Sequence, residues 1–203
     1  MLVGYRGKMY GPYPVGSMSF LSDSQPVMED TIYDLASLTK VVATTTAALL
    51  LLEDGAMSLG HTVGSFYAKA PPDKAEITLK QLLTHTAGIP QLELYRVLTD
   101  PDDAIDHILD TELAFKPGTQ FLYSCLHFVL LGKIVERCAS ETLDAFVTRH
   151  IFEPLGMYDT CFNPPQGIQD RIAYTEWCVM EKAFLRGKVH DENSRFLGGV
   201  SGN

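Results

Sequence analysis

The sequence is poor in basic residues, and those it has are scattered. It holds 16 Lys and Arg against 25 Asp and Glu, which gives a formal net charge of −9 over 203 residues. No basic run is longer than a residue or two. Because affinity for phosphates needs clustered Lys and Arg, this composition argues against binding to nucleic acid or to anionic membranes.

Long apolar runs and an export signal are also lacking. The most apolar stretch, residues 47–52, is far shorter than the roughly 20 residues that cross a bilayer, so we interpret it as part of a buried core helix. The start of the chain, MLVGYRGKMY, has no basic segment followed by a long apolar core and does not resemble a signal peptide. We expect no membrane span. The chain as given would be cytoplasmic, although its compartment is otherwise unknown.

Cysteine motifs are missing as well. None of the four cysteines is spaced as C-x-x-C, so the sequence does not favour a zinc site or a thioredoxin-like centre. We expect free thiols, and no metal or organic cofactor is implied. The cysteines are Cys125, Cys138, Cys161 and Cys178.

The elements that are present are mostly helical. Residues 2–11 predict a hairpin around Arg6–Gly7–Lys8, and a strand is expected shortly afterwards, near residue 17. Helices are expected over residues 37–54, from Thr78 to near Gly88, over "DPDDAIDHILD", over the segment after "FKPGTQFLYS", and over "TLDAFVTRHIFEPLGM". A further strand is expected at residues 171–175. So few strands cannot cover five helices, so we expect a fragment or a chain completed by another.

A serine and a lysine lie three residues apart in "DLASLTKVVATTT". On a helix, Ser37 and Lys40 share one face and can form a hydrogen bond. At a helix N-terminus, the free N–H groups favour negative charge on a serine oxygen, and a neutral lysine can act as its base. The alternative is an N-capping Ser37 with a solvated Lys40. Alone, the S-x-x-K pattern is weak, since it occurs by chance roughly once in a chain of this length.

Other segments occur in a recognisable order around this pair. The sequence contains "DTIYDLASLTKVVATTTAALLLLEDG", "LLTHTAGIP", "KPGTQFLYSCLHFVLLGKIVE" and "RGKVHDENSRFLGGVSGN". Together they resemble the superfamily of serine β-lactamases and penicillin-binding proteins. The class C branch, with its family VIII carboxylesterase and DD-peptidase relatives, is the most similar.

The resemblance implies an α+β fold with a helical lobe and a partial antiparallel sheet whose C-terminal strands are missing. Residues 1–203 would form a single, C-terminally incomplete domain. Within it, residues 1–35 would carry the N-terminal hairpin of the α/β lobe, residues 36–160 the helical lobe, and residues 161–203 a loop-rich return segment. Exposed sheet edges would favour self-association.

The resemblance also implies roles for four residues. Ser37 corresponds to the serine that is acylated, Lys40 to the lysine that assists it, and Tyr123 to the tyrosine that moves protons between nucleophile and leaving group. Cys125 stands where class C enzymes have a substrate-binding asparagine in Y-x-N. Because a thiol donates poorly to an amide carbonyl, this change weighs more against β-lactam or peptide recognition than against ester cleavage.

Three histidine positions also invite a functional interpretation. We interpret His85 in "LTHTAG" as a hydrogen-bonded scaffold residue and His127 as a surface residue. His190–Asp191–Glu192–Asn193 could suggest a metal cluster, but consecutive residues point in different directions, so a loop near the rim of the site is expected instead.

The family's third motif, K-T-G or H-x-G, does not occur after Tyr123 in this sequence. The strand that carries it supplies one of two oxyanion donors, and losing one such donor costs about two to three orders of magnitude in rate. We therefore hold two hypotheses. The first is a serine hydrolase that acts through an acyl-enzyme on small esters, D-amino-acyl peptides or β-lactams. The second is a catalytically silent fragment or binding module.

Overall fold

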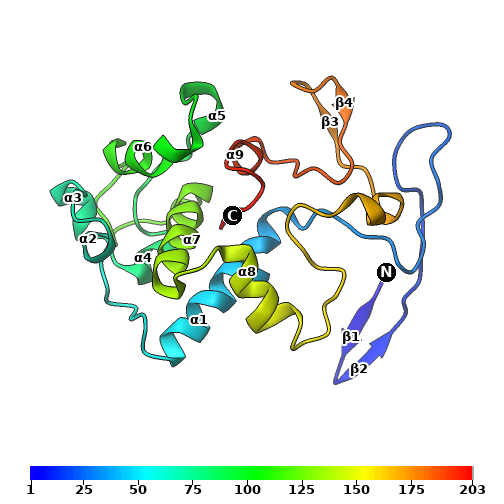
Figure 1. The fold of residues 1–203 in the computed structure, drawn as a ribbon, viewed down its shortest axis with the longest axis horizontal. Helices are drawn as coiled ribbons and strands as arrows, with labels where there is room; N and C mark the ends of the chain where they lie inside the picture. Colours follow the sequence, from blue (N-terminus) through cyan, green and yellow to red (C-terminus); the bar gives the residue numbers. More distant parts are fainter. Residues whose placement is uncertain (203) are drawn as a thin grey trace. The chain divides into compact units, whose positions relative to one another are not determined.

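The computed structural model describes residues 1–202, and the chain within it divides into two units. Unit 1 combines Met1–Asp34 with Asn163–His190, and unit 2 combines Leu35–Phe162 with the segment from Asp191 onward. Each unit is therefore built from segments that are distant in sequence. In Figure 1, unit 1 contains both small sheets, and unit 2 contains all the α-helices.

Unit 1 contains two hairpins. Strands β1 (Val3–Tyr5) and β2 (Lys8–Tyr10) pair antiparallel, which confirms the predicted N-terminal hairpin. Its two-residue turn places Arg6 and Gly7 at φ +48° and +74°, the conformation whose twist suits tight hairpins. The second hairpin, β3 (Trp177–Cys178) with β4 (Ala183–Phe184), was not expected from the sequence, and a 3-10 helix, η5 (Gln166–Arg171), precedes it.

The predictions of strands near residue 17 and at residues 171–175 are wrong. The first is reduced to an isolated antiparallel bridge between Ser17 and Pro26, and proline has no N–H with which to extend a ladder. The second segment is extended but bonds to three different partners. Ala173 N donates to Ile32 O at 2.9 Å, while the next two residues donate to Met18 O and Leu185 O. No single neighbouring segment runs alongside it, so no strand forms.

Unit 2 is a helical assembly, and the helices predicted from residues 37, 78, 101, 125 and 142 onward are all present. The first begins with a 3-10 turn and six residues of π-helix, and the fifth ends in π-helix. The elements are η1 (Ala36–Leu38), η2 (Lys40–Thr45), α1 (Thr46–Glu53), α2 (Val63–Phe66), α3 (Pro72–Ala75), α4 (Leu79–Leu83), α5 (Leu94–Val97), η3 (Pro101–Asp103), α6 (Ala104–Asp110), α7 (Cys125–Ala139), α8 (Leu143–Val147), η4 (Thr148–Phe152) and α9 (Glu192–Phe196).

Two of these helices differ from the prediction. Helix α4 starts after Thr78, whose hydroxyl accepts from Gln81 N as expected for a cap, but it ends at Leu83 because His85 adopts φ +55° and turns the chain. Helix α9 lies where a loop was predicted. The Asp191 carboxylate accepts from Ser194 N at 2.7 Å and caps it. The D-x-x-S spacing at this point was a readable capping signal.

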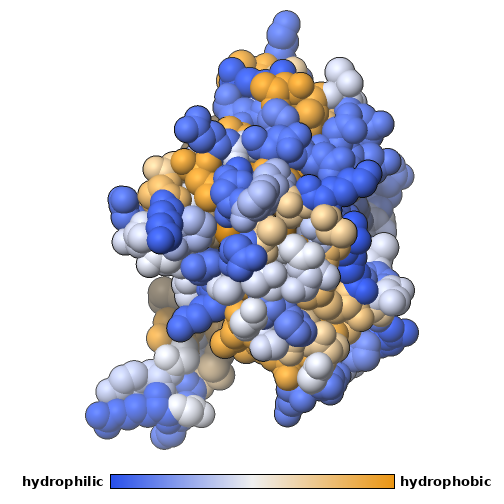
Figure 2. Space-filling view, turned by 90° about the vertical axis from the view of Figure 1, so that its left-hand side faces the viewer, coloured by the Kyte–Doolittle hydropathy of each residue, from blue (hydrophilic) through white to orange (hydrophobic). Residues whose placement is uncertain are grey.

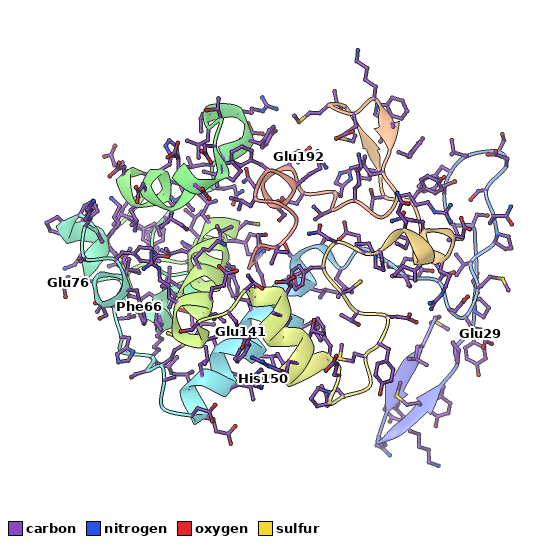
Figure 3. All side chains as sticks on the ribbon, in the orientation of Figure 1. Glu29, Phe66, Glu76, Glu141, His150 and Glu192 are labelled. Carbon is purple, nitrogen blue, oxygen red and sulfur yellow. The ribbon has the colours of Figure 1, made fainter. Side chains whose placement is uncertain are left out.

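Helix α7 lies at the centre of unit 2. It packs against α1, α4, α6 and α8, and its side chains fill the space between these neighbours (Figures 1 and 3). The buried stripe predicted on this helix is confirmed at Phe128, Leu131 and Val135, while Cys138 is half-buried. Burial extends beyond that stripe, since every residue from Leu126 to Gly132 is buried. A helix that is apolar on nearly all sides belongs in the interior of the unit.

Charged pairs on the surface of unit 2 contribute little to its stability. Figure 2 shows the face over α2, α3, α5 and α6, where apolar patches are interspersed among hydrophilic side chains. Glu141 and His150, labelled in Figure 3, have 4.0 Å between Oε1 and Nε2, and Arg149 also pairs with Glu141. Surface pairs of this kind contribute about 0–1 kcal/mol each, so the apolar core holds the unit together.

The segment after α9 inserts against α7. A Cβ on Gly132 would lie 2.9 Å from Gly202 Cα, and one on Gly202 would lie 1.9 Å from Phe128 O. The buried Thr44 hydroxyl donates to Gly202 O at 2.7 Å. The two glycines allow the backbones of α7 and the return segment to approach each other closely.

By length and composition, the helical segment Ala36–Glu53 would pass as a membrane span, but the core helix of a globular protein passes the same test. The absence of a span therefore stays a prediction.

Candidate active site

Ser37 lies on an exposed bend at the start of the first helix. It belongs to η1, and the residue before it, Ala36, adopts φ +46°. Left-handed backbone is costly for a residue with a Cβ, by about 1 kcal/mol or more, and such strain often accompanies functional positions. Ser37 is not a capping residue here, because the N-cap position of η1 is Leu35 and no side-chain cap bond forms. Its hydroxyl oxygen instead faces two proton-bearing groups.

Lys40 is the first of these groups. Its side chain is buried, with 4% of the residue exposed, and Nζ donates to Ser37 Oγ at 2.9 Å. Nζ also lies 5.1 Å from the centre of the Tyr123 ring and 5.8 Å from that of Phe128. Among residues 1–202, the contacts of this ammonium are to hydroxyl, thiol and ring faces rather than to a carboxylate. A negative charge on Ser37 Oγ would therefore be its nearest counter-charge.

Tyr123 is the second group. Its phenol donates to Ser37 Oγ at 2.7 Å, across 86 residues of sequence. The residue lies immediately before Ser124, the N-cap of α7, and is 47% exposed. Ser37, Lys40 and Tyr123, which the sequence motifs brought together as candidates, thus meet at one hydroxyl oxygen.

A loop after α4 holds the start of α7 in place, a role that no sequence motif predicted. Gln91 Oε1 accepts from Cys125 N at 2.8 Å, and the Ser124 hydroxyl donates to Pro90 O at 3.2 Å. Backbone bonds add to these contacts, since Leu122 N donates to His85 O at 2.9 Å and Gly118 N to Thr86 O at 2.8 Å. The loop therefore fixes the backbone that carries Tyr123.

Cys125 is the first residue of α7, and its Sγ accepts from Lys40 Nζ at 3.4 Å. The side chain is half-buried. The position predicted to contact substrate thus lies beside the lysine and within reach of the same site. Its thiol is a weak acceptor for the ammonium and a weak donor toward any substrate carbonyl.

Ser37, Lys40 and Tyr123 border a pocket of about 490 Å³. The remainder of its lining is mainly aliphatic and aromatic, as is common in the clefts that bind small molecules. The lining residues are Leu35, Ser37, Leu38, Lys40, Val41, Thr45, Leu83, His85, Tyr123 and Phe128.

The histidines differ in part from the predictions. His85 makes hydrogen bonds, as expected of a scaffold residue, and it also lines the pocket. The prediction for His127 is wrong, because this side chain is fully buried in α7, with its Nδ1 3.0 Å from His85 Nδ1. Burial lowers the pKa of His127 to about 4, the neighbouring His85 acts in the same direction, and the Ile89 carbonyl acts against them. Burial, followed by the charge of Lys40, also lowers the pKa of His85.

The side chains of His190–Asp191–Glu192–Asn193 engage different partners. His190 Nδ1 lies 3.1 Å from the Thr175 hydroxyl, Asp191 caps α9, and Asn193 Nδ2 donates to Leu92 O at 2.7 Å. Within residues 1–202, no group of three or more His, Cys, Asp and Glu side chains is placed to hold a metal ion.

The arrangement around Ser37 can support one kind of chemistry in particular. A hydroxyl oxygen that receives both an ammonium and a phenol is held where negative charge is stabilised. Either partner, once it has lost its proton, can accept the serine's proton and return it later. The geometry is that of a serine nucleophile with two candidate proton carriers.

Comparison with known proteins places this arrangement in a family. The beta-lactamase family model matches residues 4–192, and the chain therefore belongs to that family, within the superfamily of serine β-lactamases and penicillin-binding proteins. A protein of Escherichia coli K12 named "Putative D-alanyl-D-alanine carboxypeptidase" is 31% identical over an alignment of 210 positions. The alignment covers 88% of this chain and 48% of that protein.

Solved structures support the same placement. A class C beta-lactamase from Rhodobacter sphaeroides is 26% identical, with a TM-score of 0.76 over 99% of this chain and 55% of that one. The D-alanine carboxypeptidase AmpC of Burkholderia cenocepacia is 24% identical, with a TM-score of 0.76 over 97% of this chain and 52% of that one, and shows the shared fold. The α+β fold predicted from the motifs is thus confirmed, and the chain spans about half the length of these relatives.

Proposed function

We propose that this chain carries the nucleophilic half of a serine hydrolase that works through an acyl-enzyme. The observation that supports this most directly is the position of Ser37 Oγ, 2.9 Å from Lys40 Nζ and 2.7 Å from the Tyr123 hydroxyl. Two potential proton carriers at one exposed hydroxyl satisfy the geometric requirement for activating a serine.

The proposed reaction has two halves. In the first, Ser37 Oγ attacks the carbonyl carbon of an ester or amide while its proton passes to Lys40 or Tyr123. The carbonyl π electrons move onto oxygen, and the tetrahedral intermediate then collapses. The bond to the leaving group breaks, and Tyr123 returns a proton to that alcohol or amine. In the second half, water attacks the acyl-serine ester and gives a proton to the deprotonated Tyr123 or Lys40. The bond between the acyl carbon and Ser37 Oγ then breaks, the acid leaves, and the same group returns the proton to Ser37 Oγ.

The substrate class follows from the relatives and from Cys125. The similar proteins are named as a D-alanyl-D-alanine carboxypeptidase and as class C beta-lactamases, which supports D-amino-acyl peptides and β-lactams as candidates. The thiol of Cys125 beside Lys40 offers a weak donor for an amide carbonyl, which favours small esters. We place esters first and β-lactams last.

A catalytically silent binding module is the second candidate. The observation in its favour is that Lys40 Nζ and the Tyr123 hydroxyl both donate to Ser37 Oγ, so neither is placed as an acceptor for the proton of the serine. Such a module would bind the acyl compound reversibly in the 490 Å³ pocket without bond formation at Ser37.

Intact-mass measurement separates the two candidates. The chain is incubated with a fluorophosphonate and, separately, with a penicillin. Serine-dependent acylation predicts a mass increase of one adduct in the wild type and in Ser58→Ala, an exposed serine outside the pocket, but none in Ser37→Ala. An unmodified wild-type chain with a folded circular-dichroism spectrum would rule out the enzyme and favour the binding module.

A further inference from the structure

A pair of histidines connects the core of unit 2 to the candidate site. His127 is fully buried within α7, and its Nδ1 lies 3.0 Å from Nδ1 of His85, which lines the pocket. A buried imidazole in an otherwise apolar stretch is costly to maintain unless its polar atoms are used. Among residues 1–202, His127 Nε2 has no hydrogen-bond partner, and the polar groups near this ring are His85 Nδ1 and the Ile89 carbonyl.

The surrounding donors indicate which nitrogen carries the proton. Ser124 N also points at His85 Nδ1, at 3.5 Å, so that nitrogen acts as an acceptor. We therefore assign the proton between the two Nδ1 atoms to His127, which puts the His85 proton on Nε2 and leaves His127 Nε2 without one. Both rings are neutral in this arrangement.

His85 in turn lies against the tyrosine of the candidate site. The ring centres of His85 and Tyr123 are 4.6 Å apart with 40° between their planes, and Phe128 and Phe121 contact other sides of the imidazole, at 5.1 and 6.0 Å. The backbone of His85 is held as well, since its N–H donates to Leu82 O and its carbonyl accepts from Leu122 N. The bond from His127 and the longer one from Ser124 N fix the orientation of the imidazole plane among these rings.

Resting on the proposed function, we propose that His127 and His85 are positioning residues for Tyr123. His127 orients the His85 ring by hydrogen bonding, and that ring holds the phenol of Tyr123 against Ser37 Oγ. Neither histidine touches the reacting atoms. A displacement of the phenol by 1 Å would cost on the order of 100-fold in rate.

Protonation of the pair would undo this positioning. If His85 Nδ1 gains a proton, two N–H groups face each other and the bond to His127 is lost. The titratable and charged groups placed against the pair are Lys40, whose charge opposes protonation of His85, and Tyr123, whose ring contacts the His85 ring. Acylation of Ser37 should therefore fall at acidic pH, with a midpoint below the ordinary pKa of histidine.

Two substitutions at His127 test the proposal. His127→Asn keeps an N–H donor close to the position of Nδ1, whereas His127→Leu has a similar volume and no donor. We expect the rate of fluorophosphonate labelling at Ser37 to fall at least tenfold in His127→Leu and to stay within about threefold of wild type in His127→Asn. Because the bond to His85 is already absent in His127→Leu, the acid limb of the pH profile should also disappear in that variant. Wild-type labelling and an unmoved profile in a folded His127→Leu chain would overturn the proposal.

Nitrogen-15 NMR of the histidine rings gives a readout that does not depend on activity. The wild-type His127 ring, assigned by comparison with His127→Asn, should be neutral and protonated on Nδ1 at pH 6. In a separate NMR measurement on the tyrosine rings, His127→Leu should show faster flipping of the Tyr123 ring than the wild type. If the wild type is never labelled, the proposed function fails, but these spectra still decide on the pair. A His127 ring protonated on Nε2, or a Tyr123 flip rate unchanged in His127→Leu, would reject it. If His127→Leu does not fold, the wild-type ring spectrum and the His127→Asn labelling rate decide.

Discussion

Units 1 and 2 bury their apolar residues to very different extents. Unit 2 has a continuous core around α7 in which Leu130 and Ile134 are fully buried. In unit 1, the N-terminal hairpin is exposed at every position, and Phe20 is 97% exposed. Buried apolar residues in unit 1 are few. They are Met18, Ile172, Ala173, Cys178 and Leu185.

The difference in burial reflects how helices and strands form their backbone hydrogen bonds and bury their apolar faces. A helix makes its backbone hydrogen bonds internally, and a single apolar face is enough for packing against neighbours that are close in sequence. A strand makes its backbone hydrogen bonds to neighbouring strands, and an isolated two-stranded hairpin is only marginally stable in water. Ser37, Lys40, Tyr123 and Cys125 all belong to unit 2. The geometry of the candidate site therefore depends on the better-packed unit.

The largest expected effect compares two tyrosines with the same exposure, one in each unit. Tyr123 is 47% exposed and Tyr10 is 46% exposed. Tyr123→Phe removes the phenol that contacts Ser37 and should slow labelling of Ser37 by about 10²- to 10⁴-fold, the usual contribution of a general acid–base group. Tyr10→Phe should leave the rate within about twofold. A comparable loss in Tyr10→Phe would show that the site depends on unit 1 as much as on unit 2.

A second comparison concerns stability. Leu130 in α7 is fully buried and Leu2 beside β1 is 58% exposed. Leu130→Ala should lower the free energy of unfolding by about 2–5 kcal/mol, because it removes buried methyl groups and leaves a cavity. Leu2→Ala should change it by less than about 0.5 kcal/mol. Urea unfolding followed by circular dichroism measures both, and equal losses would contradict the difference in packing between the units.

The pH dependence of stability tests the buried imidazole of unit 2. The pKa of His127 is lowered to about 4, so between pH 4 and about 6.5 the unfolded chain binds more protons than the folded one. The contribution of His127 to the free energy of unfolding is therefore fully present above about pH 6.5 and is lost as the pH falls toward 4. His85, whose pKa is also lowered, acts in the same direction.

From pH 7 to pH 4.5, the wild type should therefore lose about 2–3 kcal/mol more than His127→Leu. The measurement is chemical unfolding of both chains at each pH. Parallel losses in the two chains would show that His127 is protonated as readily when folded as when unfolded.

The smallest effect concerns two glycines. A Cβ at Gly132 in α7 would meet Gly202 Cα at 2.9 Å, whereas a Cβ at Gly167 in unit 1 would meet nothing within 4 Å. Alanine is the better helix former at either position, but at position 132 the contact should dominate and lower the free energy of unfolding by about 1–2 kcal/mol. Gly167→Ala should be neutral or slightly stabilising. Thermal melts distinguish these outcomes, and a stable Gly132→Ala chain would mean that the segment at Gly202 moves away at little cost.

Much of unit 2 was predictable because its signals are local. The stripe of Phe128, Leu131 and Val135 and the capping residue Thr78 act over three or four residues, which is the range of helix periodicity. The position of His127 could also have been inferred. It is surrounded in sequence by apolar residues on all sides of α7, which indicates burial rather than exposure. The strands of unit 1 were less predictable, since β3 and β4 have two residues each and cannot show alternation.

The family, the helices of unit 2 and the candidate residues Ser37, Lys40 and Tyr123 could be predicted from the linear chain, because ordered motifs and helical spacing are properties of the sequence. Only the tertiary structure decided that Gln91 holds the start of α7, that Cys125 contacts Lys40, and that His127 reaches His85. These contacts join residues 34 to 85 positions apart. The physical reason is that hydrogen bonds between distant segments depend on how the loop after α4 folds back, and that path has no periodic signal in the sequence.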